Sequence, residues 1–369
     1  MQSRVVMLVD LDYFFAQCEE KRNLSIRDQP VVVCVYSGRS EDSGAVSTAN
    51  YVARKYGVKS GIPIYLAKRK LKDLDAVFLP VDHQFYQKVS EEIMSILRSH
   101  ADTFEQVGID EAYLDVSRKV KANFEEAERL AKRMKDDVKA KQKLTCSIGI
   151  GPNKLVAKIA ADIQKPDGLT VVRPDEVEGV LSPLPVSRLI GIGRKTEKKM
   201  ETLGIRTVGD VAEYDVRRLI EVFGRNLGTY FHNASLGIDN EPVQERGETE
   251  SISRISTLKE DTRDLEVIMD KTVQLCEDIH ASLIQRGVSF KSVGILAVMK
   301  DMSVRSRSKT LKESTRDLQV LRRTVRELFE KFLNESELET RRVGVKVSNF
   351  VEKQEKKRDL TSFLDASKG

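Results

Sequence analysis

Residues 5–15 read VVMLVDLDYFF, and residues 107–116 read VGIDEAYLDV. Both stretches are strand-like apolar runs that carry carboxylates. A carboxylate beside a buried strand costs desolvation energy unless a cation or hydrogen-bond donors compensate it. If the two runs converge, Asp10, Asp110 and Glu111 form an oxygen-rich site suited to a divalent cation such as Mg²⁺, an ion that holds and activates phosphates.

Both stretches belong to an ordered set of motifs. The segments VDLDYFFAQ and IDEAYLD resemble the catalytic motifs of Y-family DNA polymerases of the DNA polymerase IV (DinB) branch, archaeal and bacterial type. Three further segments resemble that family in the same order, namely SGAVSTANYVARKYGVKSGIPI, IGPNKLVAKIAADIQKPDG and GIGRKTEKKMETLGI. The resemblance implies a template-directed translesion DNA polymerase that adds dNMP from dNTP to a primer 3′-hydroxyl, with low fidelity and without proofreading.

The composition predicts a multidomain protein of the cytoplasm. With 369 residues, 40% of them hydrophobic, the chain can form roughly two to four domains with real cores. It has no apolar run near the ~20 residues that span a bilayer and no secretory leader, so we expect no membrane contact. The net charge of +5 does not by itself indicate nucleic acid.

The cysteines predict neither a zinc site nor a disulfide framework. None of the four, Cys18, Cys34, Cys146 and Cys276, forms a close pair in the sequence. Reduced thiols in a reducing compartment are the simplest interpretation.

The resemblance and the hydrophobic spacing predict an α+β fold of the right-hand polymerase type. Apolar residues recur at helical spacing over residues 124–141, 264–286 and 315–334. The pattern resembles a ferredoxin-like palm, small fingers, a helical helix-hairpin-helix thumb and a βαββαβ little-finger domain. The expected bounds are 1–13 and 81–172 for the palm, 14–80 for the fingers, 173–237 for the thumb, 238–248 for a linker, 249–351 for the little finger and 352–369 for a flexible tail.

By this resemblance the acidic site performs two-metal-ion catalysis. Asp10 and Asp110 would bridge two Mg²⁺ ions, and Glu111 would favour the ion that activates the primer hydroxyl. The Leu11 carbonyl would bind the ion on the nucleotide side. The alternative is that these acids cap turns or pair with nearby lysines.

Three neighbouring residues are not assigned as ligands. Asp12 and Asp115 are interpreted as structural, although strand alternation places Asp12 on the same face as Asp10. Gly108 stands where many members of the family carry Ser, so a hydrogen bond behind the ligands could be lost, and we expect activity to survive.

The nucleotide site is predicted from one short helix and three residues outside it. Tyr51 and Arg54 are three apart and can face the same way on a helix. The resemblance assigns both to the β- and γ-phosphates, with Lys165 on the other side and a hydroxyl from Thr48. Phe15 would lie under the sugar and exclude a 2′-hydroxyl. The alternatives are a solvated surface charge for Arg54 and core packing for Phe15.

A glycine-rich turn predicts a contact with the DNA backbone. Gly191 and Gly193, followed by Lys195 and a helix, resemble a helix-hairpin-helix. Such glycines let backbone N–H groups approach a phosphate. An ordinary turn is the alternative.

Basic residues on three predicted strands suggest a second DNA contact. Residues two apart on a strand share one face. We expect a basic face opposite the helices of the little finger, and a merely solvated face is the alternative. The residues are Arg254, Arg305, Arg307, Lys309, Arg341, Arg342 and Lys346.

The tail resembles a sliding-clamp-binding peptide. Leu360, Phe363 and Leu364 have the required apolar spacing, although Lys357 stands where Gln is usual. A tail with chance hydrophobic residues is the alternative. The expected partners are primer–template DNA, dNTP and a sliding clamp, and the protein is expected to be a monomer.

Two other functions remain open at this point. A nucleotide cyclase uses a similar palm and two metals but needs no hairpin clamp on DNA. An inactive DNA-binding scaffold would not need the acid at position 110.

Overall fold

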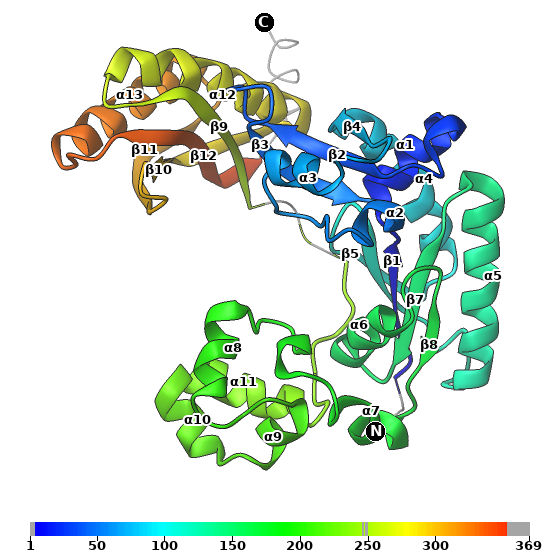
Figure 1. Ribbon diagram of the computed structural model, residues 1–369. Coiled ribbons are helices and arrows are strands. Elements are labelled where there is room, and N and C mark those ends of the chain that lie inside the picture. Colours follow the sequence, from blue (N-terminus) through cyan, green and yellow to red (C-terminus); the bar gives the residue numbers. More distant parts are fainter. Residues whose placement is uncertain (1–3, 246, 248–249, 353–369) are drawn as a thin grey trace, which may run out of the picture. The chain divides into compact units, whose positions relative to one another are not determined.

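The computed structural model describes residues 4–245, 247 and 250–352. The chain divides into two compact units (Figure 1). The first comprises Met1–Val35 and Ala45–Gly247, and the second comprises Tyr36–Gly44 and Glu248–Gly369.

A five-stranded sheet forms the centre of the first unit. Its strand order is β5-β6-β1-β7-β8. Strand β1 pairs antiparallel with both β6 and β7, so the VVMLVDL run lies in the middle of the sheet. The strands are β1 (Val6–Leu11), β5 (Thr103–Gln106), β6 (Glu111–Asp115), β7 (Cys146–Gly151) and β8 (Leu169–Val171).

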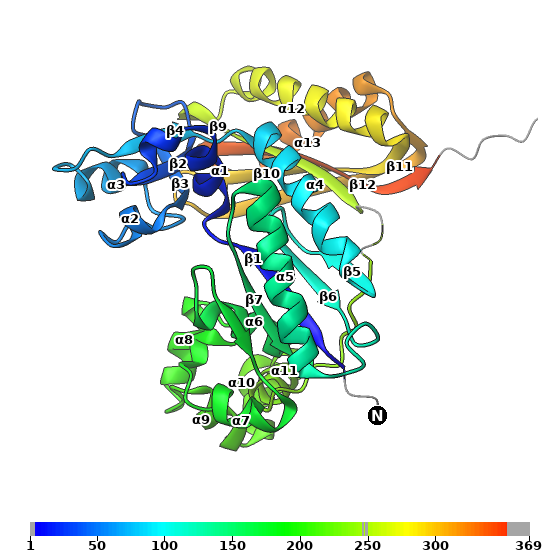
Figure 2. The same cartoon turned by 90° about the vertical axis from the view of Figure 1, so that its right-hand side faces the viewer.

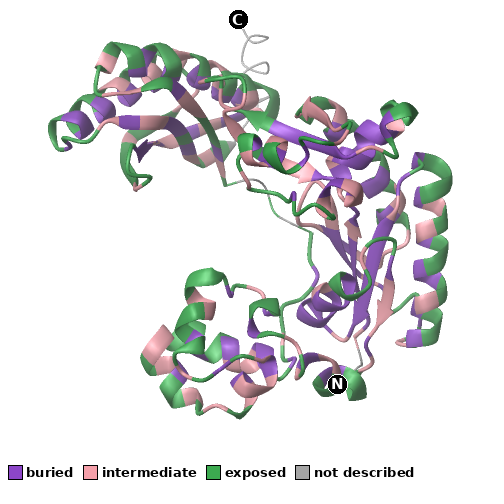
Figure 3. Ribbon diagram, viewed as in Figure 1, coloured by how far each residue is buried: buried purple, intermediate pink, exposed green. Residues whose placement is uncertain are grey.

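Helices cover both faces of this sheet, which explains why β1 is apolar on both sides (Figures 2 and 3). Met7 and Val9 belong to the core under α4 (His83–Ser99) and α5 (Phe124–Gln142). Leu8 faces α6 (Lys154–Ile163) instead.

The close approach of α6 depends on a glycine. A β-carbon at Gly149 of β7 would lie 2.0 Å from the Ala157 carbonyl oxygen of α6, so no larger residue fits. Asn153 caps the helix by accepting a hydrogen bond from the Val156 N–H. Lys158 is thereby carried over the sheet face that bears Leu8.

A smaller three-stranded sheet, in the order β3-β2-β4, lies in the region expected to form the fingers. Strand β2 is parallel to β4, and Val32, Val46 and Ile64 belong to its core. The elements are α1 (Phe14–Arg22), η1 (Leu24–Ile26), β2 (Val31–Tyr36), β3 (Gly44–Ala49), α2 (Tyr51–Arg54), α3 (Ile64–Lys70) and β4 (Val77–Pro80).

The following region is helical and packs around Leu219 and Phe231. Short helices separated by glycines and prolines account for its sequence pattern. They are η2 (Pro174–Glu176), α7 (Val177–Leu181), η3 (Val186–Arg188), α8 (Arg194–Glu201), α9 (Val208–Glu213), α10 (Val216–Phe223) and α11 (Arg225–Ser235).

The segment after α11 is bound to α6 and the central sheet by buried charges. The Lys154 ammonium lies 2.9 Å from Glu105 Oε2 and 2.8 Å from Glu241 Oε1. The Gln244 N–H also donates to Glu105, and the Asn153 amide donates to the Gly237 carbonyl. This contact is long-range in sequence and had no signal in the linker composition.

The second unit contains a four-stranded antiparallel sheet in the order β11-β10-β12-β9. Helices α12 and α13 cover one face and share its core with the strands (Figure 2). The βαββαβ prediction is therefore confirmed. The elements are β9 (Ser251–Thr262), α12 (Leu265–Arg286), β10 (Val288–Met299), β11 (Val304–Thr315), α13 (Leu318–Asn334) and β12 (Thr340–Glu352).

All four cysteines are buried free thiols. Within residues 4–245, 247 and 250–352, no helix has the length and apolar character needed to cross a bilayer.

Candidate active site and nucleic-acid interface

Strand pairing brings the three predicted acids together where the C-terminal end of β1 meets the N-terminal end of β6 in the central sheet. Asp10 of β1 lies directly opposite Glu111 of β6. Asp110 occupies the turn before β6, where its carbonyl accepts a hydrogen bond of 2.8 Å from the Leu11 N–H. The acids are therefore neighbours in space although about a hundred residues separate them in the sequence.

Two lysines neutralise these carboxylates. Lys165 Nζ lies 2.7 Å from Asp10 Oδ2 and 2.8 Å from Asp162 Oδ1. Lys158 Nζ lies 2.6 Å from Glu111 Oε2. In the part of the chain that the structure describes, no three His, Cys, Asp or Glu side chains are arranged to hold a metal ion. The ammonium groups stand where a cation is electrostatically favoured.

The acids carry more negative charge than the lysines balance. Burial raises the pKa of Asp10 to about 6, against the opposing effect of Lys165 and with further contributions from Asp110 and Glu111. Burial and the neighbouring Glu111 also raise the pKa of Asp110. Burial opposes protonation of Lys165, but its pairing with Asp10 and Asp162 raises the lysine pKa nevertheless.

Gly108 lies close behind the acids. A β-carbon at this position would be 3.2 Å from Asp110 Oδ1 and 3.3 Å from Glu111 Cγ, so a serine here would require these side chains to shift by a few tenths of an ångström. The Gly108 carbonyl accepts a hydrogen bond from the Gln106 amide, which fixes the turn. The expectation that activity survives with glycine at position 108 stays a prediction from the sequence.

The predicted nucleotide residues line one cavity of about 270 Å³. They share it with the acids Asp10 and Asp110. Sequence reasoning missed Ser60 as a lining residue, although it lies within the quoted motif SGAVSTANYVARKYGVKSGIPI. The predicted residues that line the cavity are Leu11, Phe15, Thr48, Tyr51, Arg54 and Lys165.

The short helix α2 presents Tyr51 and Arg54 to the cavity. The Asn50 side chain caps it by accepting a hydrogen bond from the Ala53 N–H. Arg54 Nε donates to the Ala49 carbonyl at 2.8 Å, and its guanidinium lies 4.9 Å from the centre of the Tyr51 ring. Among the described residues Arg54 has no carboxylate partner, so its terminal N–H groups remain available for an anion.

The aromatic ring of Phe15 is held in place by a residue that the sequence did not reveal. Tyr86 of α4 stacks on it, with ring centroids 4.3 Å apart and planes at 16°. The Tyr86 hydroxyl donates to Glu19 at 2.7 Å, which fixes the tyrosine in turn. A stacked pair of this kind restricts the Phe15 ring to one orientation.

The glycine-rich turn precedes α8 as predicted. Gly191 has φ +86°, a conformation that side-chain-bearing residues rarely adopt. Gly193 is the N-cap of α8, and Lys195 lies exposed in its first turn. The Tyr230 hydroxyl donates to the Ile190 carbonyl and fixes the turn from α11.

The strand register corrects the prediction for several basic residues. Arg305 and Arg307 of β11 lie opposite Ala297 and Ile295, which are buried in the core beneath the helices. Lys309 follows the same alternation. The three do share one face, but it is the helix-covered face and not the open one.

These basic side chains reach past the edge of the sheet to partners on or beside α13. Arg307 pairs with Glu335 at 2.7 Å, and Lys309 pairs with Glu327 at 2.6 Å. Arg305 donates to the Ser336 hydroxyl.

Arg254 and Arg341 also have partners within the second unit. Arg254 lies opposite the buried Val345 and donates to the Ser282 hydroxyl of α12, so it too belongs to the helix side. Arg341 lies 3.8 Å from Asp261.

The open face of the second sheet has a hollow of about 700 Å³ that Lys346 lines, and strand alternation places Arg342 on the same face outside the hollow. Arg342, Gly344 and Lys346 alternate along β12, and Gly344 lies opposite Ile255 and Leu296. Neither cation has an ion pair among the described residues. Hydroxyl groups supply much of the remaining lining, namely Ser253, Ser306 and Ser308. The clamp-binding residues Leu360, Phe363 and Leu364 lie outside the described residues.

Comparison with known proteins agrees with this geometry. The impB/mucB/samB family matches residues 9–162, its C-terminal domain matches residues 249–360, and the DNA polymerase-iota thumb domain matches residues 187–239. A Y-family DNA polymerase chimera of Dbh and Dpo4 has a TM-score of 0.88 at 36% identity, covering 94% of this chain and 99% of its own. The fold is that of a Y-family polymerase, with palm, thumb and little-finger domain.

Curated relatives extend over nearly the whole chain. DNA polymerase IV of Nitrosopumilus maritimus is 48% identical, covering 99% of this chain and 100% of the relative. DNA polymerase IV of Methanosarcina acetivorans is 44% identical with the same coverage. The chain belongs to the DNA polymerase IV family. It is an error-prone DNA-directed DNA polymerase of translesion synthesis, which decides against the cyclase and the inactive scaffold.

Replacing Asp10 by Asn tests the electrostatic balance of the site. The folded-state pKa of Asp10, about 6, exceeds its ordinary value of 3.8, so the folded protein binds more protons between these values and its stability falls as pH rises through them. Asp10→Asn removes this effect. We expect the free energy of unfolding to increase by ~1–2 kcal/mol at about pH 7.5, with no gain near pH 4, as measured by urea unfolding.

The matched control is Asp162→Asn. Asp162 also pairs with Lys165, but its side chain is 43% exposed. This variant should not be more stable than the parent at either pH. If Asp10→Asn were less stable than the parent at the higher pH, the ion pair with Lys165 would outweigh the burial of the acid.

Proposed function

We propose that the cavity of about 270 Å³ binds the incoming dNTP. The observation that carries this assignment is the meeting, in one cavity, of two acids with Tyr51, Arg54 and Lys165. The Arg54 guanidinium comes from α2 and the Lys165 ammonium from the segment that follows α6. Because both line the cavity, a triphosphate can be held between them. Arg54 offers a planar pair of N–H donors to a phosphate, and Lys165 offers a point charge.

We also propose that Asp10, Asp110 and Glu111, with the Leu11 carbonyl, hold two Mg²⁺ ions. The support is a group of three neighbouring acids: burial, with smaller contributions from Asp110 and Glu111, raises the pKa of Asp10, and two lysines pair with the group. When bound, such ions polarise the α-phosphate and lower the pKa of the primer hydroxyl.

Lys165 has a second task in this proposal. Its ammonium neutralises Asp10 before substrate binds, at 2.7 Å. Because Lys165 also lines the nucleotide cavity, it can exchange Asp10 for a phosphate oxygen when the nucleotide enters. The carboxylate is then released for metal binding at the moment when the triphosphate arrives.

Primer–template DNA would contact the glycine-rich turn and the open face of the second sheet. Gly191 and Gly193 expose backbone N–H groups for phosphates, and Arg342 and Lys346 supply cations that have no ion pair in the part of the chain that the structure describes. Both contacts are independent of sequence, as a replication enzyme requires. Binding of a sliding clamp, a monomeric state and a cytoplasmic location remain predictions from the sequence.

Extension of a primed template tests the catalytic assignment. Asp110→Asn should lower the insertion rate by at least about a thousandfold with Mg²⁺ present, because it removes a ligand charge at the reacting phosphate. Asp115→Asn is the matched control on the same hairpin and should retain most activity. Equal activity of the two variants would remove Asp110 from the catalytic site.

Phe15→Ala tests the sugar contact. Without the ring a 2′-hydroxyl fits, so insertion of ribonucleotides relative to deoxynucleotides should rise at least about tenfold, or ~1.4 kcal/mol in relative barrier. Single-nucleotide kcat/KM values for matched rNTP and dNTP give the ratio within one variant. A ratio equal to that of the parent would leave Phe15 as a packing residue.

Lys346→Ala tests the open face against the helix side. Lys346 has no ion pair among the described residues, whereas Arg307 is bound to Glu335. We expect Lys346→Ala to weaken duplex binding and to reduce the salt slope by about one, since one phosphate contact is lost. Arg307→Ala should change both much less. Fluorescence anisotropy at several salt concentrations measures the slopes, and the reverse order of effects would contradict the assignment.

A further inference from the structure

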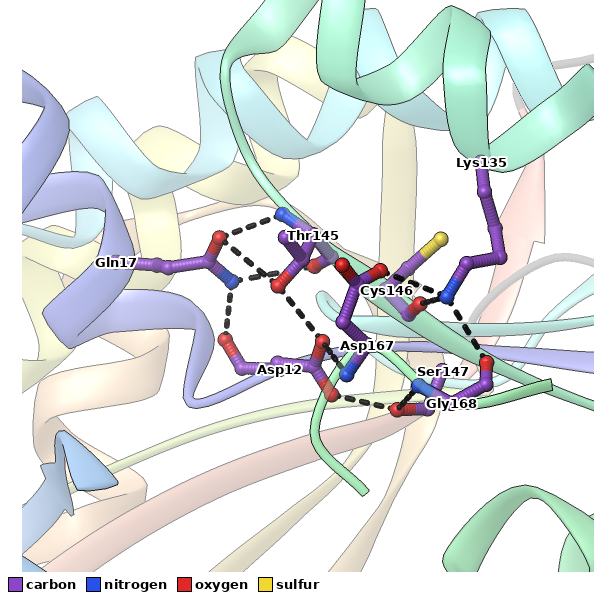
Figure 4. Close-up of polar contacts among 8 residues, drawn as sticks. All are labelled: Asp12, Gln17, Lys135, Thr145, Cys146, Ser147, Asp167 and Gly168. Carbon is purple, nitrogen blue, oxygen red and sulfur yellow. Dashed lines mark hydrogen bonds and ion pairs between the residues drawn. The ribbon is translucent and has the colours of Figure 1, made fainter. Parts of the chain in front are cut away.

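The carboxylate of Asp12 is the most buried acid near the active site, and the chemistry above does not use it. The residue is 1% exposed and lies between the proposed metal ligand Asp10 and the aromatic residue Phe15. An ionised group at this depth needs strong compensation. Figure 4 shows that its oxygens are surrounded by donors from two other segments of the chain.

Three hydrogen bonds reach the Asp12 carboxylate. Oδ2 accepts from the Thr145 hydroxyl at 2.8 Å and from the Asp167 backbone N–H at 2.9 Å. Oδ1 accepts from the Ser147 hydroxyl at 2.7 Å. The Ser147 oxygen in turn accepts from the Gly168 N–H at 3.2 Å. Asp12 thus binds residues 167–168 both directly and through Ser147.

The same two residues are bound from the opposite side by Lys135 of α5. Its ammonium donates to the Gly168 carbonyl at 3.0 Å and to the Cys146 carbonyl at 2.8 Å. It also forms an ion pair of 2.7 Å with Asp167 Oδ1. The Asp12 carboxylate therefore holds the N–H groups of residues 167–168, directly and through Ser147. The partly buried Lys135 ammonium holds the Gly168 carbonyl and the Asp167 carboxylate (Figure 4).

This segment connects α6 to β8 and carries Lys165 two residues before Asp167. The Lys165 ammonium contacts Asp10, which lies two residues before Asp12. Residues 10–12 and residues 165–167 are therefore joined at two points. The first is the ion pair of Asp10 with Lys165 at the cavity, and the second is the buried hydrogen bond from the Asp167 N–H to Asp12. The hydrogen bonds from Asp12 and Ser147 to residues 167–168 fix the position of the backbone from which the Lys165 side chain extends.

We propose that Asp12 is a positioning residue for Lys165: its buried carboxylate fixes residues 165–168 so that the Lys165 ammonium stands between Asp10 and the triphosphate. The proposal rests on the proposed nucleotide role of Lys165. It differs from the sequence interpretation of Asp12 as merely structural, because it assigns a defined effect on substrate binding.

The chemistry of the site explains why an ionised carboxylate is present. Hydrogen bonds to a charged acceptor are roughly twice as strong as neutral ones, which suits the anchoring of a loop that carries a mobile cation. An amide at this position has one acceptor oxygen, so Asp12→Asn cannot accept from all three donors. The substitution preserves shape, removes the charge and loses at least one of the three hydrogen bonds, so it weakens the anchor.

Hydrogen exchange tests the anchor itself. In Asp12→Asn the amides of Asp167 and Gly168 should exchange at least about tenfold faster, while those of β6 keep their rates. The matched control Asp115→Asn, whose carboxylate accepts from the Ser117 N–H at 2.9 Å, should leave Asp167 and Gly168 unchanged. Unchanged exchange at 167–168 in Asp12→Asn would overturn the proposal.

A double-mutant cycle tests the link to Lys165. Single-nucleotide insertion should show KM for dNTP raised at least about fivefold in Asp12→Asn, with kcat changed less, and raised likewise in Lys165→Ala. The double variant should be no worse than Lys165→Ala alone, because both changes remove one contact. Ser147→Ala, a milder change, should move KM in the same direction if Asp12→Asn folds poorly.

The outcomes separate this proposal from the proposed function. Effects on KM that multiply in the double variant would overturn it, since Asp12 would then act independently of Lys165. A fall in thermal stability with KM unchanged in Asp12→Asn and Ser147→Ala, but raised in Lys165→Ala, would also overturn it. If Lys165→Ala itself leaves KM unchanged, the nucleotide role of Lys165 fails, and the proposal fails with it even where exchange at 167–168 has increased.

Discussion

The pairing of β1 with β6 and β7 is the constraint on which the active site depends. It places Asp10 opposite Glu111 on one side and opposite Ser147 on the other. A shift of one residue in this register would turn Asp10 into the core and a buried valine toward the cavity. The hydrophobic faces of β1 prevent such a shift, because α4, α5 and α6 cover both sides of the sheet.

The site that results holds charge at the expense of stability. Burial raises the pKa of Asp10 while the neighbouring Lys165 ammonium opposes the rise. Positively charged groups are placed by long-range contacts rather than by neighbours in sequence. Lys158 is brought by the close packing of α6 on Gly149, and Lys165 by the segment that Asp12 binds.

The little-finger domain shows the limit of strand alternation as a guide. Arg305 and Arg307 share a face, as their spacing predicts, but alternation cannot say which face the helices cover. The register shows that they lie on the helix side at an edge strand, where long side chains can reach acids beside α13. Arg342 and Lys346 alternate with core valines along β12 and therefore lie on the open face, where Gly344 and Lys346 line the hollow.

The sequence by itself determined the family, the order of the elements, the position of the three acids and most of the residues that line the cavity beside them. These follow from short motifs, because a few consecutive residues are enough to indicate both the local structure and the functional side chains. Only the tertiary structure decided that Tyr86 supports Phe15, that lysines neutralise Asp10 and Glu111, and that Asp12 binds Asp167. Those partners come from separate strands and helices, and a hydrogen bond or a stacked ring requires an approach of a few ångströms that only the packing of those elements fixes.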